Sequence, residues 1–169
     1  MEQTSWLKYI KRSVLVAAVF LLQFIFADHL RLFGVAPNFA FCFVLTISFL
    51  KKAKFSFYTA LILGVLLDSV SGRLFGTYTV FFMLLAFGIR EFYHSAFSEN
   101  FVIEALFGLL VCFLYSVSYA FFISLYRGQF LTLISQTAWI EFLYNFIIFL
   151  AMLFVQTKHN QKHRSVFRL

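Results

Sequence analysis

The chain has 169 residues, of which 62% are hydrophobic, 22% are aromatic and 12% are charged, and its mean hydropathy is +0.88. Soluble domains contain roughly 45–50% apolar and about 25% charged residues, so this composition excludes an ordinary soluble domain and indicates an integral membrane protein. The net charge of +7 comes from basic residues spread over several short stretches. This spread argues against nucleic-acid binding and favours contact with the anionic headgroups of a lipid bilayer.

Apolar stretches predict six transmembrane helices in a single domain that covers residues 1–169. A helix needs about 20 mostly apolar residues to cross a bilayer, or about 17 where flanking residues reach the interface. Six stretches meet or approach this length, at residues 9–27, 35–50, 55–71, 74–90, 101–126 and 136–156. Only a glycine-containing corner separates the third from the fourth, which predicts a tight helical hairpin.

The basic residues predict the orientation of these helices. With six crossings, 11 of the 14 basic residues fall on one side of the membrane, namely Lys8, Lys11, Arg12, Lys51, Lys52, Lys54, Arg90, Lys158, Lys162, Arg164 and Arg168. The other side has only Arg31, Arg73 and Arg127. Because positively charged loops stay in the cytoplasm, we expect both termini to be cytoplasmic.

The sequence lacks the common catalytic and cofactor motifs. It contains no P-loop, GxGxxG, CxxC or HExxH, so nucleotide, dinucleotide and zinc chemistry have no support. His159 and His163 stand four residues apart, but the basic residues around them would repel a metal cation. Cys42 and Cys112 lie in apolar stretches, where a free thiol behaves as a small hydrophobic group. We expect no enzyme activity, no cofactor, no metal and no disulfide.

One carboxylate interrupts the third apolar stretch, in the sequence GVLLDSVSG at residues 64–72. A charge inside the membrane costs about 2.5–3.5 kcal/mol even on lenient insertion scales, so Asp68 requires compensation. Glycine or aspartate recurs at every fourth position from residue 64 to 76, a spacing that lets helix backbones approach closely. The predicted central corner and packing motif consists of Gly64, Asp68, Ser71, Gly72 and Gly76.

Other polar residues reach the same depth in the outer half of the membrane when positions are counted along each helix. The predicted outward polar cavity is lined by Gln23, Asn38, Asp68, Thr77, Tyr78, Glu141 and Asn145. Two interpretations stay open. In the first, Asp68 caps a helix N-terminus or pairs with Arg73, and Asn145 forms a hydrogen bond between helices. In the second, the cavity opens outward and receives a ligand or a segment of a partner.

The remaining carboxylates do not form a catalytic pair with Asp68. Glu91, Glu99 and Glu104 lie toward the cytoplasmic side, whereas Asp68 lies near the outer corner. Paired general acid–base catalysis requires two carboxylates at one site. We expect these three residues at the interface, partly paired with Arg90.

Two motifs resemble a known family. Arg31, Pro37 and Asn38 form R-x5-P-N before the second stretch, and residues 64–76 read G-x-x-x-D-x-x-S-G-x-x-x-G. Together with six stretches and a late asparagine, Asn145, they resemble the MreD family of bacterial rod shape-determining proteins. The resemblance covers essentially the whole chain, although the last stretch lacks the glycine and proline that often accompany the asparagine.

The resemblance implies a non-enzymatic scaffold in the bacterial inner membrane that helps maintain rod shape by organising lateral peptidoglycan synthesis. It implies an all-α, six-helix fold similar to the S-component of energy-coupling-factor vitamin transporters. The implied partners are MreC, a second copy of the chain, and, directly or indirectly, MreB, RodA and penicillin-binding protein 2. The alternative function is a small-molecule-binding subunit of such a vitamin transporter, in which the polar cavity would hold the substrate.

Overall fold

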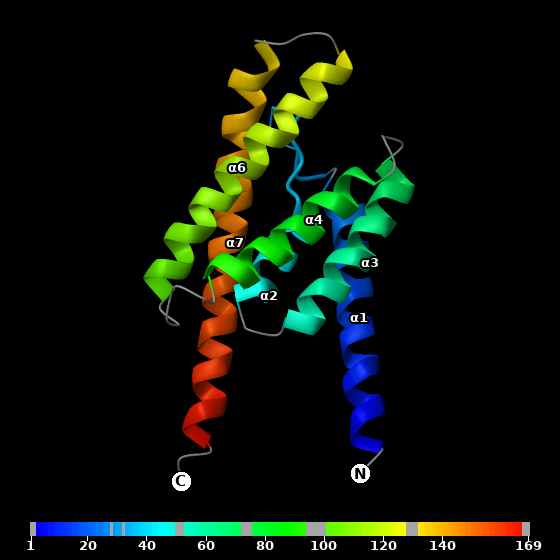
Figure 1. Ribbon diagram of the computed structural model, residues 1–169, viewed down its shortest axis with the longest axis vertical. Coiled ribbons are helices and arrows are strands. Elements are labelled where there is room, and N and C mark those ends of the chain that lie inside the picture. The colour runs from blue at the N-terminus through cyan, green and yellow to red at the C-terminus, as the bar shows by residue number, and fades with distance from the viewer. Residues whose placement is uncertain are drawn as a thin grey trace.

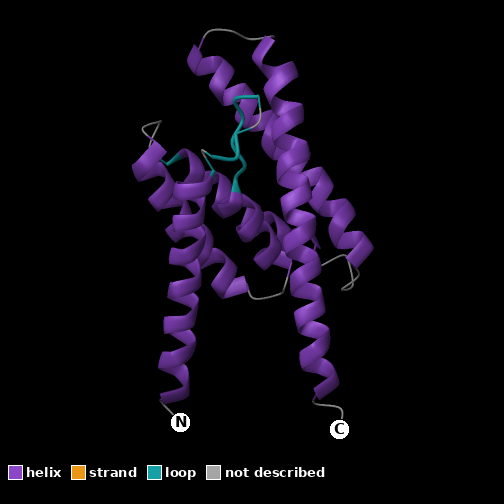
Figure 2. Cartoon of the chain, turned by 180° about the vertical axis from the view of Figure 1, so that it is seen from behind, coloured by secondary structure: helices purple, strands orange, loops and turns teal. Residues whose placement is uncertain are grey.

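The described residues form helices joined by loops. The computed structural model describes residues 3–27, 29–31, 33–49, 53–71, 76–93, 101–127 and 132–166. Its elements are α1 (Gln3–Phe26), α2 (Phe39–Phe49), α3 (Ala53–Ser71), α4 (Thr77–Gly88), the π-helix η1 (Ile89–Tyr93), α6 (Phe101–Arg127) and α7 (Thr132–Val166) (Figure 1). Figure 2 shows no strand in this part of the chain. The prediction of an all-helical protein is confirmed.

A short helix, α2, forms the centre of the bundle. α3 packs against α4 and α6 packs against α7, so two helical hairpins are present. α2 contacts both hairpins through α3, α4 and α7, and it also contacts α1 and η1. In Figure 1, α2 lies between the α6–α7 pair and the side formed by α1 and α3, and both chain ends lie at the bottom. The other helices are therefore arranged around α2.

The composition of α2 explains its central position. Its sequence, FAFCFVLTISF, has no charged residue and is apolar on every face. Nine of its 11 residues are buried, and only Phe39 and Phe43 are partly exposed. A helix that is hydrophobic all round belongs in a core, whereas an amphipathic helix would lie at the edge. Thr46 and Ser48 are tolerated there because their hydroxyls donate to the carbonyls of Cys42 and Val44, both at 2.7 Å.

The predicted second stretch, residues 35–50, starts too early. The helix begins at Phe39, because Pro37 has no backbone N–H and disfavours helical geometry in the residue before it. Residues 33–38 run instead as an irregular segment that leads into α2 (Figure 2). The chain turns at Phe33 and Gly34, whose φ angles are 51° and 82°. Both lie in the left-handed region, which is ordinary for glycine and uncommon for phenylalanine.

This irregular segment has a consequence at membrane depth. The 11 residues of α2 span about 16 Å at about 1.5 Å per residue, roughly half of the ~30 Å hydrocarbon core. Non-helical backbone is tolerated inside a membrane only where protein covers it. Val35, Pro37 and Asn38 are buried, so the bundle covers the part of the segment next to α2, whereas Phe33 and Gly34 are exposed.

The other helices overlap the remaining predicted stretches: α3 ends at residue 71 and α6 begins at residue 101, as predicted, whereas several other boundaries differ. α4 begins at Thr77, with residues 72–75 outside the described part, and η1 continues it to Tyr93. α7 extends to Val166, beyond the predicted end at residue 156. Among the described residues, three segments are long and apolar enough to span a membrane by length and composition, namely Lys54–Ser71, Phe101–Phe121 and Ala138–Lys158.

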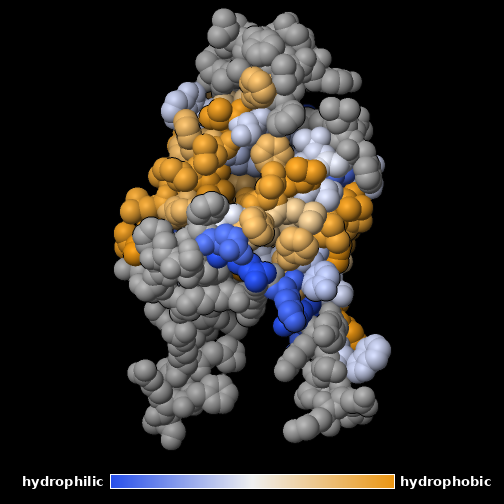
Figure 3. All heavy atoms as spheres, viewed as in Figure 1, coloured by the Kyte–Doolittle hydropathy of each residue, from blue (hydrophilic) through white to orange (hydrophobic). Residues whose placement is uncertain are grey.

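The outward faces of the bundle are strongly apolar. Figure 3 shows hydrophobic residues across the middle of the molecule and hydrophilic residues below them. On α1, Val14, Leu21 and Phe24 are exposed by 62%, 53% and 59%. Contiguous apolar surface of this kind would promote aggregation in water, whereas it is compatible with lipid acyl chains. The surface therefore agrees with the composition in indicating a membrane protein.

Gly108 of α6 lies against the side chain of Phe149 on α7. A Cβ atom at this position would overlap the ring of Phe149, which fills the space that the missing side chain leaves. Small residues at helix interfaces permit such close backbone approach in membranes. Four further buried residues follow the same face of α6 at four-residue spacing, namely Glu104, Cys112, Ser116 and Ala120.

The core position of both cysteines gives a first prediction. Cys42 and Cys112 are free thiols with 0% exposure. We expect neither to react with a membrane-permeant maleimide in the native protein, and both to react after denaturation in sodium dodecyl sulfate, as counted by mass spectrometry. His29→Cys, at an exposed loop position, is the control and should be labelled in the native state. Rapid native labelling of Cys42 or Cys112 would contradict the buried core.

Candidate functional site

Asp68 of α3 caps the N-terminus of α4. Its Oδ1 accepts a hydrogen bond from the backbone N–H of Tyr78 at 2.9 Å. Its Oδ2 accepts from the backbone N–H and the hydroxyl of Thr79, at 3.0 and 2.6 Å. Hydrogen bonds to a charged group contribute about 1.5–3 kcal/mol each, so three of them offset an insertion cost of about 2.5–3.5 kcal/mol. The positive end of the α4 dipole adds to this stabilisation.

Two glycines make this contact geometrically feasible. Gly76 occupies the N-cap position of α4 with φ 100°, and it has no side chain to supply a cap, so the acceptor comes from α3. A Cβ atom at Gly64 would lie 2.5 Å from the Cα of Thr79 and 2.9 Å from its backbone nitrogen. The backbones of α3 and α4 therefore touch at Gly64. Ser71 donates to the carbonyl oxygen of Asp68 at 3.4 Å, and Gly72 and Arg73 lie outside the described residues.

A second group of polar side chains caps the N-terminus of α2. Asn38 is the N-cap residue, and its Oδ1 accepts from the backbone N–H of Phe41 at 2.9 Å. Gln23 reaches over from α1, where its Oε1 accepts from the backbone N–H of Phe39 at 2.6 Å and of Ala40 at 3.3 Å. Its Nε2 donates to the carbonyl of Pro37 at 3.1 Å. The first three N–H groups of α2 are thus all satisfied by side chains.

Residues from α6 and α7 complete this second group. Asn145 accepts a hydrogen bond from the backbone N–H of Asn38 at 2.9 Å, and Tyr115 accepts one from the Asn38 side-chain amide at 2.7 Å. The thiol of Cys42 donates to the carbonyl of Asn145 at 3.2 Å. Asn145 is fully buried, so each of these contacts lies inside the protein. Four helices, α1, α2, α6 and α7, therefore meet at Asn38.

Aromatic rings connect the two polar groups. Tyr115 stacks on Phe41 with ring centroids 4.0 Å apart and on Tyr119 at 5.9 Å. The hydroxyl of Tyr119 lies 3.4 Å from that of Tyr78, whose backbone N–H contacts Asp68. The predicted cavity residues thus divide into one group around Asp68 and another around Asn38. Their described hydrogen bonds are largely to one another and to helix ends.

Sequence reasoning missed several residues of this arrangement. Thr79 and Tyr115 supply direct hydrogen bonds, and Gly108 sets the spacing of α6 and α7. Tyr115 and Tyr119 stand four residues apart, and this repeat of a polar aromatic on one helix face was the available signal.

The other acidic residues occupy separate places. Glu141 is buried one turn before Asn145. Glu104 is buried on α6, whereas Glu91 is exposed and lies 3.7 Å from Arg90. Among the described residues, no group of three or more histidine, cysteine or acidic side chains is arranged to hold a metal ion. Glu99 lies outside these residues.

Comparison with known families places this geometry in context. A family model described as the rod shape-determining protein MreD matches residues 4–162. The chain belongs to the MreD family. No curated protein and no solved structure matches it. The MreD match includes both capped helix ends and supports a role in rod shape determination.

The contact at Gly64 gives a second prediction. Gly64→Ala places a methyl group against the backbone of Thr79, which cannot move without separating α3 from α4, so we expect a loss of about 1–3 kcal/mol in unfolding free energy. Gly88→Ala is the matched control, because nothing lies within 4 Å of its Cβ position. The control should be neutral or slightly stabilising, by up to about 1 kcal/mol. Thermal unfolding in detergent compares the two, and equal midpoints would argue against the close contact.

The contact at Asn145 gives a third prediction. Asn145→Leu removes the acceptor for the buried N–H of Asn38, and an unsatisfied buried donor costs about 1–3 kcal/mol. Tyr144→Phe removes an exposed hydrogen bond to the carbonyl of Leu30, and its cost should stay within about 0.5 kcal/mol. Urea unfolding of both variants in mixed micelles measures the difference. A larger loss in Tyr144→Phe would show that the inner contact is not the stabilising one.

Proposed function

We propose that the chain is a non-enzymatic scaffold of the cell-elongation machinery, which binds MreC and helps to organise lateral peptidoglycan synthesis. One observation carries this proposal. Asp68, the residue that most needed a functional explanation, directs both carboxylate oxygens to the N-terminus of α4. A carboxylate committed to three internal hydrogen bonds is suited to holding helices in a fixed relation, and it is poorly suited to catalysis.

The proposal includes a location and an orientation. We place the chain in the bacterial inner membrane with six spans and both termini in the cytoplasm; the second span would consist of α2 and the irregular segment before it. The three candidate spans and the apolar exterior support the membrane location, and the basic residues near both chain ends support the orientation. The fold similarity to the S-component of energy-coupling-factor transporters remains part of the proposal.

The partners are proposed from the family and from the surface of the bundle. α1 contacts only part of the bundle and exposes large apolar side chains along most of its length, so a single-span protein such as MreC has helix surface available for packing. A second copy of the chain would use similar apolar surface. MreB, RodA and penicillin-binding protein 2 would associate directly or through MreC.

Co-purification tests the scaffold function. The full chain, tagged at its C-terminus, is extracted from native membranes in mild detergent, and associated proteins are identified by mass spectrometry. We expect MreC, with or without the synthase pair. Recovery of an ATPase pair with a membrane coupling subunit would overturn the scaffold function in favour of vitamin transport.

Substitution of Asp68 gives a fourth prediction. Asp68→Ala leaves the N–H groups of Tyr78 and Thr79 without their acceptor, at a cost of about 2–4 kcal/mol in unfolding free energy. We expect less folded protein, less MreC in the purified complex, and rounded cells when this variant is the sole copy.

Glu91→Gln is the matched control for this substitution. It removes one carboxylate from an exposed pair with Arg90, and exposed pairs contribute about 0–1 kcal/mol. Control cells should stay rod-shaped with MreC retained. Normal assembly and normal rods with Asp68→Ala would refute the role assigned to the Asp68 cap.

A further inference from the structure

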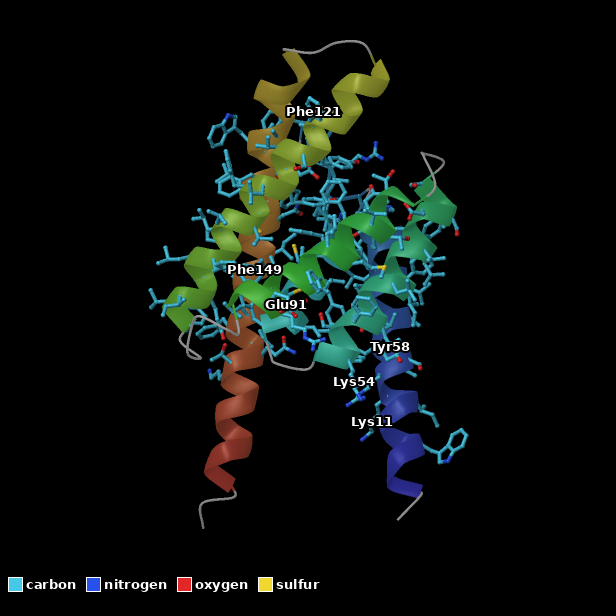
Figure 4. The ribbon with its side chains drawn as sticks, in the orientation of Figure 1. Lys11, Lys54, Tyr58, Glu91, Phe121 and Phe149 are labelled. Atoms are coloured by element: carbon cyan, nitrogen blue, oxygen red, sulfur yellow. The ribbon has the colours of Figure 1, made fainter. Side chains whose placement is uncertain are left out.

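Three basic residues gather at one end of the seam between α1 and α3. The two helices pack against each other, and the guanidinium carbon of Arg12 lies 5.1 Å from the centroid of the Phe55 ring. Lys11 is next to Arg12 on α1, and Lys54 is next to Phe55 on α3. Figure 4 shows Lys11 and Lys54 at the lower part of the bundle, below Tyr58. All three basic side chains are exposed.

The two helices offer no acidic side chain to neutralise this cluster. α1 has none between Gln3 and Phe26, and α2, which packs on both, has no charged residue. The single acid of α3 is Asp68, which lies at the opposite end of that helix and caps α4. Glu91 of η1 pairs with Arg90. Within α1, α2 and α3 as the structure describes them, the cluster of Lys11, Arg12 and Lys54 is therefore a local excess of positive charge.

The stacking of Arg12 prepares it to bind an anion. The face of a guanidinium is attracted to the face of an aromatic ring. The N–H groups at the edge of the guanidinium then stay available for an anion. Those N–H groups form a planar fork that matches two oxygens of a phosphate. Lys11 and Lys54 add two further donors on either side of the seam. The three groups together suit a phosphate better than a single carboxylate.

Both helices also have exposed apolar side chains beyond this cluster. Val14 and Leu15 of α1 are exposed by 62% and 45%, and Leu61 and Ile62 of α3 by 38% and 46%. Tyr58, exposed by 63%, lies one turn from Lys54 and is a residue type enriched at membrane interfaces. Lys54 is also the first residue of a candidate span. The basic side chains therefore lie where a lipid headgroup would lie, and the apolar side chains lie where its acyl chains would lie.

We infer that Arg12, Lys11 and Lys54 form a binding site for the phosphate of an anionic phospholipid, with the acyl chains lying along α1 and α3. The exposed apolar side chains of α1 and α3 favour a lipid over a free phosphate. The three basic side chains favour an anionic headgroup over a zwitterionic one. The orientation given under the proposed function decides only the leaflet in which the lipid lies, which is the cytoplasmic leaflet. Lipid binding is measured on the isolated chain, so it can fail or succeed independently of MreC association.

Native mass spectrometry of the full chain in detergent tests this site. The protein is titrated with phosphatidylglycerol and with phosphatidylcholine of the same acyl chains, and retained lipids are counted. We expect phosphatidylglycerol to bind more tightly by about tenfold or more, because each basic residue near an anionic headgroup contributes about fivefold. Equal retention of the two lipids would overturn the site.

Matched double variants show whether the cluster itself is responsible. Arg12→Gln with Lys54→Gln removes two cations from the site, and we expect phosphatidylglycerol affinity to fall by about tenfold or more. Arg90→Gln with Lys158→Gln removes the same charge elsewhere, and Lys158 also lies over a phenylalanine, Phe154, at 5.8 Å. This control should stay within about twofold of the original chain. An equal loss of phosphatidylglycerol affinity in both variants would show that net charge alone controls binding, and it would overturn the specific site.

Two further arms complete the test. Arg12→Lys keeps the charge but loses the planar fork, so we expect a smaller loss than in the double variant. Glycerol phosphate at millimolar concentration should not displace phosphatidylglycerol, because it lacks acyl chains. Displacement of phosphatidylglycerol by glycerol phosphate would overturn the assignment of a lipid as the ligand and indicate a site for soluble phosphate. Unchanged melting temperatures of all variants confirm that folding is intact.

Discussion

The N–H groups at the start of α2 must find acceptors in the interior of an apolar bundle, and this requirement shapes most of the structure. A helix end on a soluble protein can turn to water, but this one is buried, and an unsatisfied donor there costs about 1–3 kcal/mol. Acceptors arrive from three helices. Gln23 comes from α1, Asn38 begins α2 itself, and Asn145 comes from α7. The position of α2 is thus set by hydrogen bonds at its N-terminus and by side-chain packing along its length.

The same solution occurs again at α4. That helix begins with a glycine that cannot cap, and the Asp68 carboxylate of the preceding helix accepts in its place. Packing alone permits helices to slide, because apolar contacts in a membrane are similar to contacts with lipid. Two polar caps, linked through Tyr115, Tyr119 and Tyr78, remove that freedom. A bundle of this kind can present constant outer surfaces to other membrane proteins while its interior stays unchanged.

Much of this architecture was accessible from the sequence, for identifiable reasons. Apolar length and charge distribution are local properties, so the helical class, the pairing of α3 with α4 and the need to compensate Asp68 could all be predicted. The second stretch was predicted to start at residue 35 because the apolar residues around Pro37 were taken as helical, whereas the helix begins at Phe39. Counting along the helices placed Asn38 and Asn145 in one polar group, although they are 107 residues apart, but it predicted neither the atoms that meet nor the part played by Tyr115, 77 residues away. Such pairs depend on helix rotation and register, which composition does not encode.

The bond between Asn38 and Asn145 has a consequence for the order in which the protein matures. α2 is synthesised early, yet one of its acceptors lies on the last helix, 107 residues later. At about 5–20 residues per second, translation leaves that donor waiting for on the order of 5–20 s. During this interval the central helix is already made but its end is incomplete, so a truncated chain would carry an exposed polar defect within the membrane. Completion of α7 therefore supplies the missing acceptor and closes this end of α2.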